Sequence, residues 1–286
     1  PLILPGNVAS AIGGGYEVAN SCRFNDGDTA YMHKTPGSAG NQKTYTISVW
    51  IKRGVLGTIQ RIMDANVDGS KDDFLRFDAS GAIKFGFNNA NVLITTALYR
   101  DPSAWYHIVL AVDTEQGTDS NRVKLYVNGT QVTAFTTESY PAEDATGFFN
   151  DTIAHYVGVE NSTTNAQPFD GYMAEVVFID GLQLAPTSFG EFDEDSPTIW
   201  KPIDVSGLTF GTNGFYLDFE DSSNLGNDAN GGTDLTEVNL AATDQATDTP
   251  TNNFCTLNPL TKRAGGTLSE GNLKYTASTG DSSVFG

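Results

Sequence analysis

Acidic side chains are the residues of this chain that could most readily do chemistry on a sugar. A glycoside hydrolase needs two carboxylates placed on either side of one glycosidic bond. The densest acidic run is Glu191-Phe192-Asp193-Glu194-Asp195. Glu194 stands where a strand would bury an apolar residue and Pro197 follows closely, so the run is typical of solvated acids in a turn. Asp218 and Glu220 would share one face of a strand, as in a polar outer face. We therefore predict no catalytic residues.

Metal chemistry has one candidate segment, Asn25-Asp26-Gly27-Asp28. Asp26 and Asp28 place hard oxygen ligands in a turn, as calcium prefers. A full calcium site needs about 6–8 oxygens, and an Asx turn produces the same sequence without a metal. Calcium stays open, with Asp26 and Asp28 as its candidate ligands, and no other cofactor is predicted. Each of the 3 histidines stands alone, without a second His or Cys at ligand spacing.

The charge of the chain excludes two classes of partner. Its 286 residues include 35 acidic and 16 basic side chains, for a net charge of −19. This balance speaks against nucleic acid, because a phosphate backbone attracts Lys and Arg, and against an anionic membrane surface. No apolar run approaches the ~18 residues that a membrane-spanning helix needs, and the first residues do not resemble a signal peptide. Cys22 and Cys255 could pair, but we expect two reduced thiols in a protein made in a cytoplasm.

Short strands joined by turns must position these residues. Strand patterns occur at residues 44–51, 74–77, 82–87, 105–112, 123–127, 152–159, 173–179 and 215–219. In the first of them, alternate residues form one apolar face: Tyr45, Ile47, Val49 and Ile51. Asn128-Gly129 directly after an alternating strand is a strong hairpin signal, because both turn residues need a positive φ. No stretch shows a helical period with caps. The sequence therefore predicts an all-β fold, an antiparallel β-sandwich.

Three motifs in order suggest which sandwich this is. Asp101–Asp113 contains a Trp-Tyr-His-Ile-Val strand, Lys124–Gly129 reads Lys-Leu-Tyr-Val-Asn-Gly, and Phe169–Val176 reads Phe-Asp-Gly-Tyr-Met-Ala-Glu-Val. Together they resemble the laminin-G-like, concanavalin A-like jelly rolls, and the resemblance covers about residues 21–185. We predict an N-terminal arm at residues 1–20, a jelly-roll domain at residues 21–222, and an extended C-terminal tail at residues 223–286 that leads toward a further domain.

The flanking segments resemble a narrower group of proteins. Asn20–Asp28, Gly214–Phe219 and Asn239–Asp244 are similar to segments of tailed-phage virion proteins, especially marine ones. This resemblance implies a non-enzymatic structural protein of the virion, a surface decoration or fibre-type component that is assembled in the host cytoplasm. Its partners would be other virion proteins of the capsid or tail. In that group Thr267–Leu273 leads into another domain, so we suspect that the natural chain continues past Gly286.

Sugar binding is the alternative function. Trp50 and Trp105 occupy positions that the resemblance places in the core, so Trp200 is the spare tryptophan and the candidate carbohydrate-binding residue. Its other interpretation is a lid packed over the end of the sandwich. An exposed Trp200 would favour a carbohydrate-binding module for a host polysaccharide. A polysaccharide depolymerase is a third, weaker interpretation.

The N-terminal arm is the candidate assembly contact. Leu2, Ile3 and Leu4 are apolar, and no partner strand is evident within residues 1–20. Leaving such side chains in water is unfavourable, at about 1.5–3 kcal/mol for each fully buried equivalent. We therefore expect a homo-oligomer, or a tight seat on another virion protein, with this arm at the contact.

Overall fold

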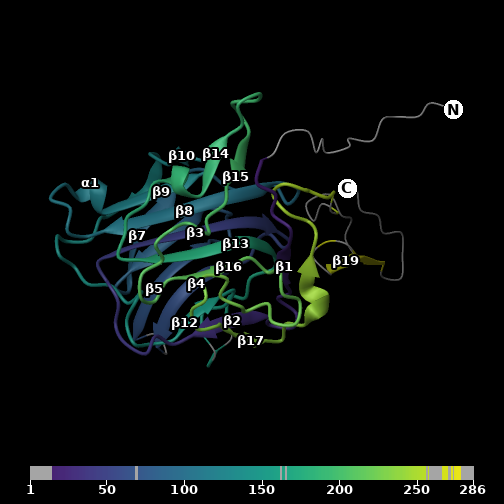
Figure 1. Cartoon of the computed structure of the whole chain (residues 1–286), viewed down its shortest axis with the longest axis horizontal. Coiled ribbons are helices and arrows are strands. Elements are labelled where there is room, and N and C mark those ends of the chain that lie inside the picture. The colour runs from purple at the N-terminus through teal and green to yellow at the C-terminus, as the bar shows by residue number, and fades with distance from the viewer. Residues whose placement is uncertain are drawn as a thin grey trace.

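Two antiparallel β-sheets pack face to face in the computed structural model (Figure 1), which describes residues 15–67, 70–161, 163–164, 166–255, 257, 266–269, 272 and 274–277. Sheet A has the order β10-β9-β8-β3-β13-β1-β18, with β16 also paired to β13. Sheet B has the order β11-β7-β6-β5-β4-β12-β2-β17. The predicted antiparallel β-sandwich is confirmed, and the topology is consistent with a jelly roll.

The elements have the following bounds. Sheet A is formed by β1 (Ser21–Phe24), β3 (Thr44–Arg53), β8 (Trp105–Asp113), β9 (Val123–Val127), β10 (Thr130–Gln131), β13 (Gly171–Asp180), β16 (Phe215–Leu217) and β18 (Gln245–Ala246). Sheet B is formed by β2 (Tyr31–Lys34), β4 (Gln60–Val67), β5 (Lys71–Phe77), β6 (Ile83–Phe87), β7 (Ala90–Thr95), β11 (Phe135–Glu138), β12 (His155–Val157) and β17 (Thr236–Val238). Two hairpins are separate: β14 (Gly190–Phe192) with β15 (Trp200–Pro202), and β19 (Gly266–Ser269) with β20 (Lys274–Ala277). The helical turns are α1 (Asp119–Arg122), η1 (Pro186–Ser188) and η2 (Ala242–Asp244).

The core between the sheets follows the alternation of the sequence. Strand β3 contributes the apolar face that was predicted from its pattern: Tyr45, Ile47, Val49 and Ile51. On β9, Val123 and Leu125 are buried in the same core and Val127 packs against it. The predicted hairpin follows, with φ of 48° at Asn128 and 75° at Gly129 before β10.

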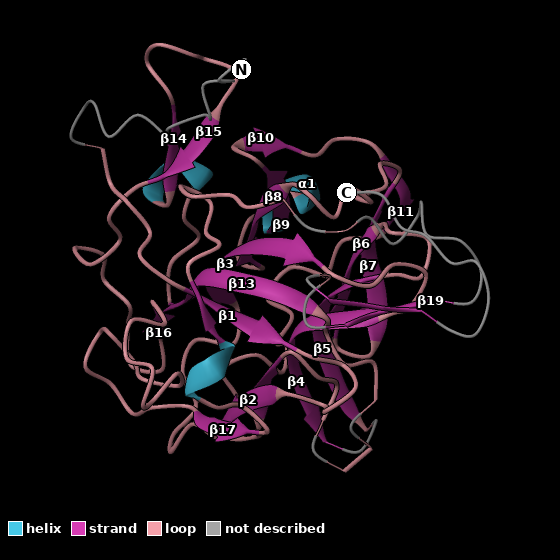
Figure 2. Ribbon diagram, turned by 90° about the vertical axis from the view of Figure 1, so that its right-hand side faces the viewer, coloured by secondary structure: helices cyan, strands magenta, loops and turns pink. Residues whose placement is uncertain are grey.

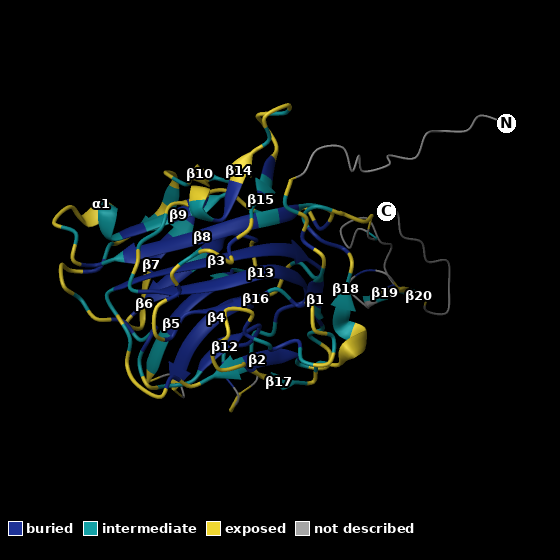
Figure 3. Ribbon diagram, in the orientation of Figure 1, coloured by how far each residue is buried: buried dark blue, intermediate teal, exposed yellow. Residues whose placement is uncertain are grey.

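A second layer covers the outer face of sheet A. Strands β3 and β13 are buried along their whole length, on both faces (Figure 3). Residues 181–214 fold back over the sheet, and Phe189, Val205 and Phe210 join the buried residues Val109, Val177, Ile179 and Tyr216 in a second apolar cluster. Each such aromatic or branched side chain contributes about 1.5–3 kcal/mol when it leaves water. The β14–β15 hairpin projects from this layer (Figure 2).

The described part of the predicted tail, residues 223–286, adds an edge strand to each sheet. Strand β17 pairs with β2, and β18 pairs with β1. Leu225 and Leu235 lie in the core between the sheets. Further along, Asp248 accepts a 2.7 Å hydrogen bond from the buried Lys52 ammonium, which ties the tail to β3. These residues therefore lie against the jelly roll of their own chain, one of the placements that their sparse apolar pattern allows.

The arm is described from residue 15 onward, so Leu2, Ile3 and Leu4 lie outside the described residues. Val18 is buried, and its N–H donates to the Thr251 hydroxyl at 3.0 Å. No disulfide joins Cys22, which is buried, to Cys255, which is exposed. Within the described part of the chain, no helix has the length and apolar character to cross a membrane.

Glu175 interrupts the central strand β13. The register with β3 shifts between Ala174 and Val177, and Glu175 has a φ of 49°. Its carboxylate is buried, and one oxygen accepts hydrogen bonds from the hydroxyls of Tyr16, at 3.1 Å, and Tyr216, at 2.8 Å. Burial raises the pKa of Glu175 to about 7, although both hydroxyls oppose that change. Glu175 therefore holds the described end of the arm, at Tyr16, against sheet A through a carboxyl group whose pKa is raised toward neutrality.

The Glu175→Gln variant should have a flatter dependence of stability on pH. An acid whose folded-state pKa is raised keeps its proton in the folded state while the unfolded chain loses it, so stability falls as pH rises from 4.5 to about 7. The variant does not lose stability in this way. Its free energy of unfolding should therefore rise by about 3 kcal/mol relative to that of the wild type between pH 4.5 and about 7. Chemical denaturation at a series of pH values measures the difference. Parallel curves of stability against pH for the two proteins would contradict the raised pKa of Glu175. The control is Glu115→Gln, at an exposed position.

Candidate functional site

A polar pocket of about 430 Å³ opens where the end of β2 meets the start of β16. We call it the Lys34 pocket. Its lining comes from three segments that are far apart in the sequence: 34–38, 211–214 and 230–233. Strand β2 belongs to sheet B and β16 to sheet A, so the pocket lies where the two sheets come together.

One buried carboxylate holds two walls of the pocket in place. Asp180, the last residue of β13, accepts hydrogen bonds from the backbone N–H of Asn41 at 2.8 Å and of Asn213 at 3.1 Å. The Asn213 amide then donates to the Ser38 carbonyl at 3.0 Å, which joins the two walls directly. Asn150 donates a further 3.0 Å hydrogen bond to Asp180. Asp180 is buried, and its partners in Asn41 and Asn213 are backbone N–H groups, so one side chain fixes the backbone at both walls.

A second buried carboxylate, Asp228, lies behind the third wall. Its Oδ1 accepts the N–H groups of Tyr216, at 3.0 Å, and Asn230, at 3.1 Å. Its Oδ2 is shielded from solvent and has no hydrogen-bond partner among the described residues. A Cβ at Gly232 would lie 2.3 Å from this oxygen, so the wall must be a glycine here. A buried acceptor without a hydrogen-bond partner costs about 1–3 kcal/mol. Asp228 does not itself line the pocket, so its charge acts on the pocket from behind this wall.

Lys34 supplies the positive charge of the pocket. Its ammonium lies 3.8 Å from Asp228 Oδ2, too far for a hydrogen bond, and 5.4 Å from the centre of the Phe215 ring. The side chain is 11% exposed, and burial lowers the pKa of Lys34 against the opposing charges of Asp228 and Asp234. The ammonium therefore has donors left for a ligand in the pocket.

Hydroxyl and amide groups surround the mouth. Thr35, Thr212 and Thr233 are exposed, and their hydroxyls make no hydrogen bond to another described residue. The side-chain amide of Asn230 is also exposed there and likewise unengaged. A hydroxyl both donates and accepts, so this rim can exchange its water for the hydroxyls of a ligand. None of the lining residues is an acid, so the pocket walls offer no carboxylate pair for hydrolysis.

The structure places Trp200 inside the layer over sheet A. It is 8% exposed, and its indole N–H donates to His107 Nδ1 at 2.8 Å. Trp50 stacks on the other side of His107, with ring centres 4.6 Å apart. A Cβ at Gly129 would lie 2.3 Å from the Trp200 ring, so the β9–β10 turn also packs on it. Trp200 therefore presents little surface to a sugar.

The candidate calcium ligands lie in a turn closed by Asn25. Its side-chain Oδ1 accepts the Gly27 N–H at 3.1 Å, and its side-chain Nδ2 donates to Asp28 at 2.8 Å, as in an Asx turn. Asp26 faces Asp170, and burial, followed by the Asp26 charge, raises the pKa of Asp170 to about 7. The described residues contain no group of three or more His, Cys, Asp or Glu side chains arranged to hold a metal ion. Calcium at Asp26 and Asp28 stays a prediction from the sequence.

The acidic run lies in the β14–β15 hairpin. Lys201 pairs with both Glu191 and Asp193 at 3.3 Å, and Asp193 Oδ1 accepts the N–H groups of Asp195 and Ser196. Asp193, Asp195 and Ser196 thus form the turn that the sequence indicated, and Glu191 faces a lysine across the hairpin rather than a second acid.

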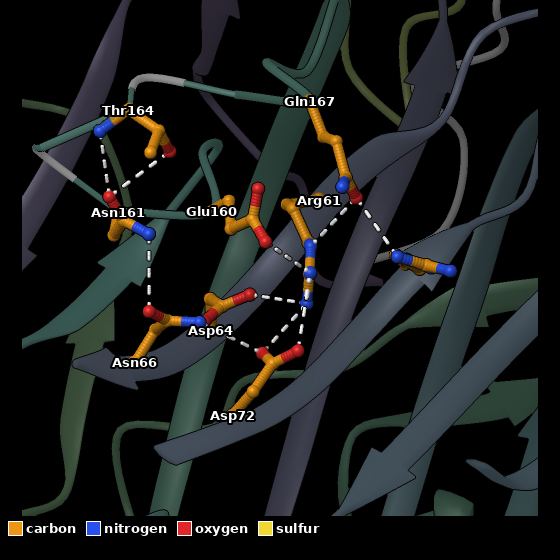
Figure 4. Close-up of polar contacts among 9 residues, drawn as sticks. Arg61, Asp64, Asn66, Asp72, Glu160, Asn161, Thr164 and Gln167 are labelled. Atoms are coloured by element: carbon orange, nitrogen blue, oxygen red, sulfur yellow. Dashed lines mark hydrogen bonds and ion pairs between the residues drawn. The ribbon is translucent and has the colours of Figure 1, made fainter. Parts of the chain in front are cut away.

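A cluster of charged residues on sheet B is fully engaged with itself (Figure 4). Arg61 pairs with Asp64 at 2.6 Å, with Asp72 at 3.1 Å and with Glu160 at 3.0 Å. Its Nε donates to Gln167 Oε1 at 3.0 Å. Burial raises the pKa of Asp64 well above its usual range, although Arg61 opposes this. Because its donors are all used, Arg61 acts as a clamp that fastens the segment after β12 onto β4 and β5.

Known structures share this fold. The chain is similar to a putative carbohydrate binding protein from Bacteroides ovatus, with 18% identity and a TM-score of 0.51, over 78% of this chain and 58% of that one. It also matches the native heptameric SAP-like pentraxin from Limulus polyphemus, with 13% identity and a TM-score of 0.42, over 60% and 80% of the two chains. Domains LG4-5 of the mouse laminin alpha1 chain match with 13% identity and a TM-score of 0.41, over 76% and 51%.

The family is given by the sequence itself. No curated protein matches the chain. Residues 26–183, more than half of it, match the model of Laminin_G_3, described as the concanavalin A-like lectin/glucanases superfamily. The matched segment contains the three motifs whose order suggested a laminin-G-like jelly roll. The chain belongs to the Laminin_G_3 family of the concanavalin A-like lectin/glucanases superfamily.

Proposed function

We propose that this chain is a non-catalytic carbohydrate-binding domain whose ligand occupies the Lys34 pocket. The observation that carries the proposal is the Lys34 ammonium, which lines the pocket with no hydrogen bond to a described residue, behind a rim of hydroxyls. This pairs an acceptor with a donor, as a sugar hydroxyl requires. The volume of about 430 Å³ lies in the range of small-ligand pockets. The family name and the carbohydrate binding protein from Bacteroides ovatus support the same class of ligand.

We further propose that the chain is a component of a phage particle. It is supported by the sequence resemblance of Asn20–Asp28, Gly214–Phe219 and Asn239–Asp244 to virion proteins. A sugar-binding domain of this kind would contact a host-surface glycan while the arm, with Leu2, Ile3 and Leu4, seats it on a neighbour. Mass spectrometry of intact virions, followed by immunogold labelling of the particle, tests this part separately from sugar binding.

Removing the Lys34 charge should weaken sugar binding. In a calorimetric titration against a panel of neutral gluco-, manno-, xylo- and galacto-oligosaccharides, we expect the wild type to bind at least one. Lys34→Met should lower that affinity by about ten- to a hundredfold, because a charge-assisted hydrogen bond is lost. Lys43→Met, at a surface lysine paired with Asp144, is the matched control and should bind as the wild type does.

The outcomes of this titration and of a parallel hydrolysis assay decide the proposal. Absence of binding across the whole panel would contradict the proposed function. Full affinity in Lys34→Met would show that the sugar does not bind in the Lys34 pocket. Gly232→Ala is the second variant, because its Cβ would collide with Asp228 Oδ2, and it should also bind more weakly. Release of reducing ends from the same oligosaccharides would favour the depolymerase interpretation instead.

Asp180 should control binding without touching the ligand. Asp180→Ala removes the acceptor of three hydrogen bonds, from Asn41, Asn150 and Asn213, and should destabilise the fold by about 3 kcal/mol. Hydrogen exchange should accelerate at residues 38–41 and 211–213, and sugar affinity should fall with it. Asp221→Ala, at an exposed acid that only caps its own turn, should change neither. Unchanged exchange in both walls would show that Asp180 does not set the pocket.

A further inference from the structure

Three cations stand side by side on the outer face of sheet B. Arg61 on β4 is in register with Arg76 on β5, and Arg76 is in register with Lys84 on β6. Arg61 and Arg76 both donate to Gln167 Oε1, at 3.0 and 2.9 Å, so their guanidinium groups lie on the same face. Neighbouring strands are about 4.8 Å apart, which places the three charges in a short row across the sheet.

The aromatic ring of Phe74 fixes this row. The guanidinium carbon of Arg61 lies 4.4 Å from the ring centre and that of Arg76 lies 4.5 Å from it. A Cβ at Gly86 would come within 2.3 Å of the same ring, so Phe74 lies over β6 at a position that only glycine leaves free. Both arginines are thereby held in defined positions before any ligand arrives.

The charges along the row are neutralised unequally. Arg61 is surrounded by Asp64, Asp72 and Glu160. Arg76 makes one side-chain hydrogen bond, to the neutral Gln167, and its Nε has no partner in the described part of the chain. Lys84 forms no ion pair or side-chain hydrogen bond with any described residue. Like charges directly opposite each other on adjacent strands are unfavourable. Although the chain has 35 acidic residues, neither of these two cations forms an ion pair with a described residue.

The pKa shifts agree with this arrangement. Burial, and next the Arg61 charge, lower the pKa of Arg76. Burial, and next the Arg76 charge, lower the pKa of Lys84. In both cases a neighbouring cation is the largest contribution after burial, so an added anion at this place would relieve a repulsion between like charges.

We propose that Arg76 and Lys84 form an anion subsite that binds the carboxylate or sulfate groups of an acidic polysaccharide. Arg76 is partly exposed, and its planar guanidinium makes one side-chain hydrogen bond, through Nη1. The lysine adds a point charge one strand away, so one anionic group can contact both. A net charge of −19 repels such a polymer over the rest of the surface, which leaves this face as its place of attachment. The subsite uses no residue of the Lys34 pocket and does not depend on the proposed binding of neutral sugars.

Dextran and dextran sulfate are the matched probes for this subsite. At low ionic strength the wild type should bind dextran sulfate more tightly than dextran, and added salt should weaken the binding. Lys84→Gln should lower the affinity by about three- to fivefold and Lys84→Glu by more, because a partly exposed ion pair is lost and then reversed. Lys124→Gln, at a half-buried lysine on β9 of sheet A, is the control and should have no effect. Polygalacturonate, tested beside dextran sulfate, distinguishes a carboxylate from a sulfate ligand.

The remaining outcomes separate the subsite from the pocket. Arg76→Lys keeps the charge and should retain most of the affinity if the protein is folded, which circular dichroism checks. Lys34→Met should bind dextran sulfate as the wild type does. Equal binding of dextran sulfate by the wild type and Lys84→Glu, or an equal loss in Lys124→Gln, would overturn the proposal while leaving the Lys34 pocket untouched.

Discussion

Asp180 is the residue on which the candidate site depends. Asp180 is the last residue of β13, a central strand of sheet A that is buried along its whole length. Its carboxylate contacts the loops at this end of the strand. A Cβ at Gly40 would come within 2.5 Å of this carboxylate, and one at Gly211 would come within 2.3 Å of the Asp180 carbonyl oxygen. The two loops can therefore approach only because both positions are glycine. The Lys34 pocket is the space that this close approach leaves between the loops and the segment at 230–233.

The outer faces of the two sheets differ in what covers them. The outer face of sheet A is covered by residues 181–214, by the described end of the arm with Tyr16 and Val18, and by the tail near Asp248. That layer buries Trp50, Trp105 and Trp200, which removes the tryptophans from contact with a ligand. The outer face of sheet B carries the Arg61 clamp (Figure 4). Arg76 and Lys84 lie beside it in register and form no ion pair with a described residue. Ligand recognition by this chain would then rest on polar groups held by buried acids, not on exposed aromatic rings.

The fold could be predicted because its signals are local. The alternation around Ile47, the turn at Asn128-Gly129 and each of the three motifs are short local patterns. The apolar face, the turn and the laminin-G-like family were all confirmed. The sequence already offered a buried Trp200, as a lid over the end of the sandwich. The contact that buries it could not be predicted, because it depends on a hairpin that folds back onto His107 from 93 residues away.

The pocket was missed for the same physical reason. Its three segments lie far apart in the chain, and Asp180 and Asp228 look like any of the 35 acids until the fold buries them. The glycine-rich stretches 211–214 and 230–232 were the available signal, since glycine is needed where backbones approach closely. The measurement that tests the central claim most directly is a crystal structure with a bound oligosaccharide. We predict a sugar ring in the Lys34 pocket, with one hydroxyl within hydrogen-bond distance of the Lys34 ammonium and another at the rim that Thr35, Thr212 and Thr233 form. A sugar ordered elsewhere on the surface, with the pocket empty, would contradict the account.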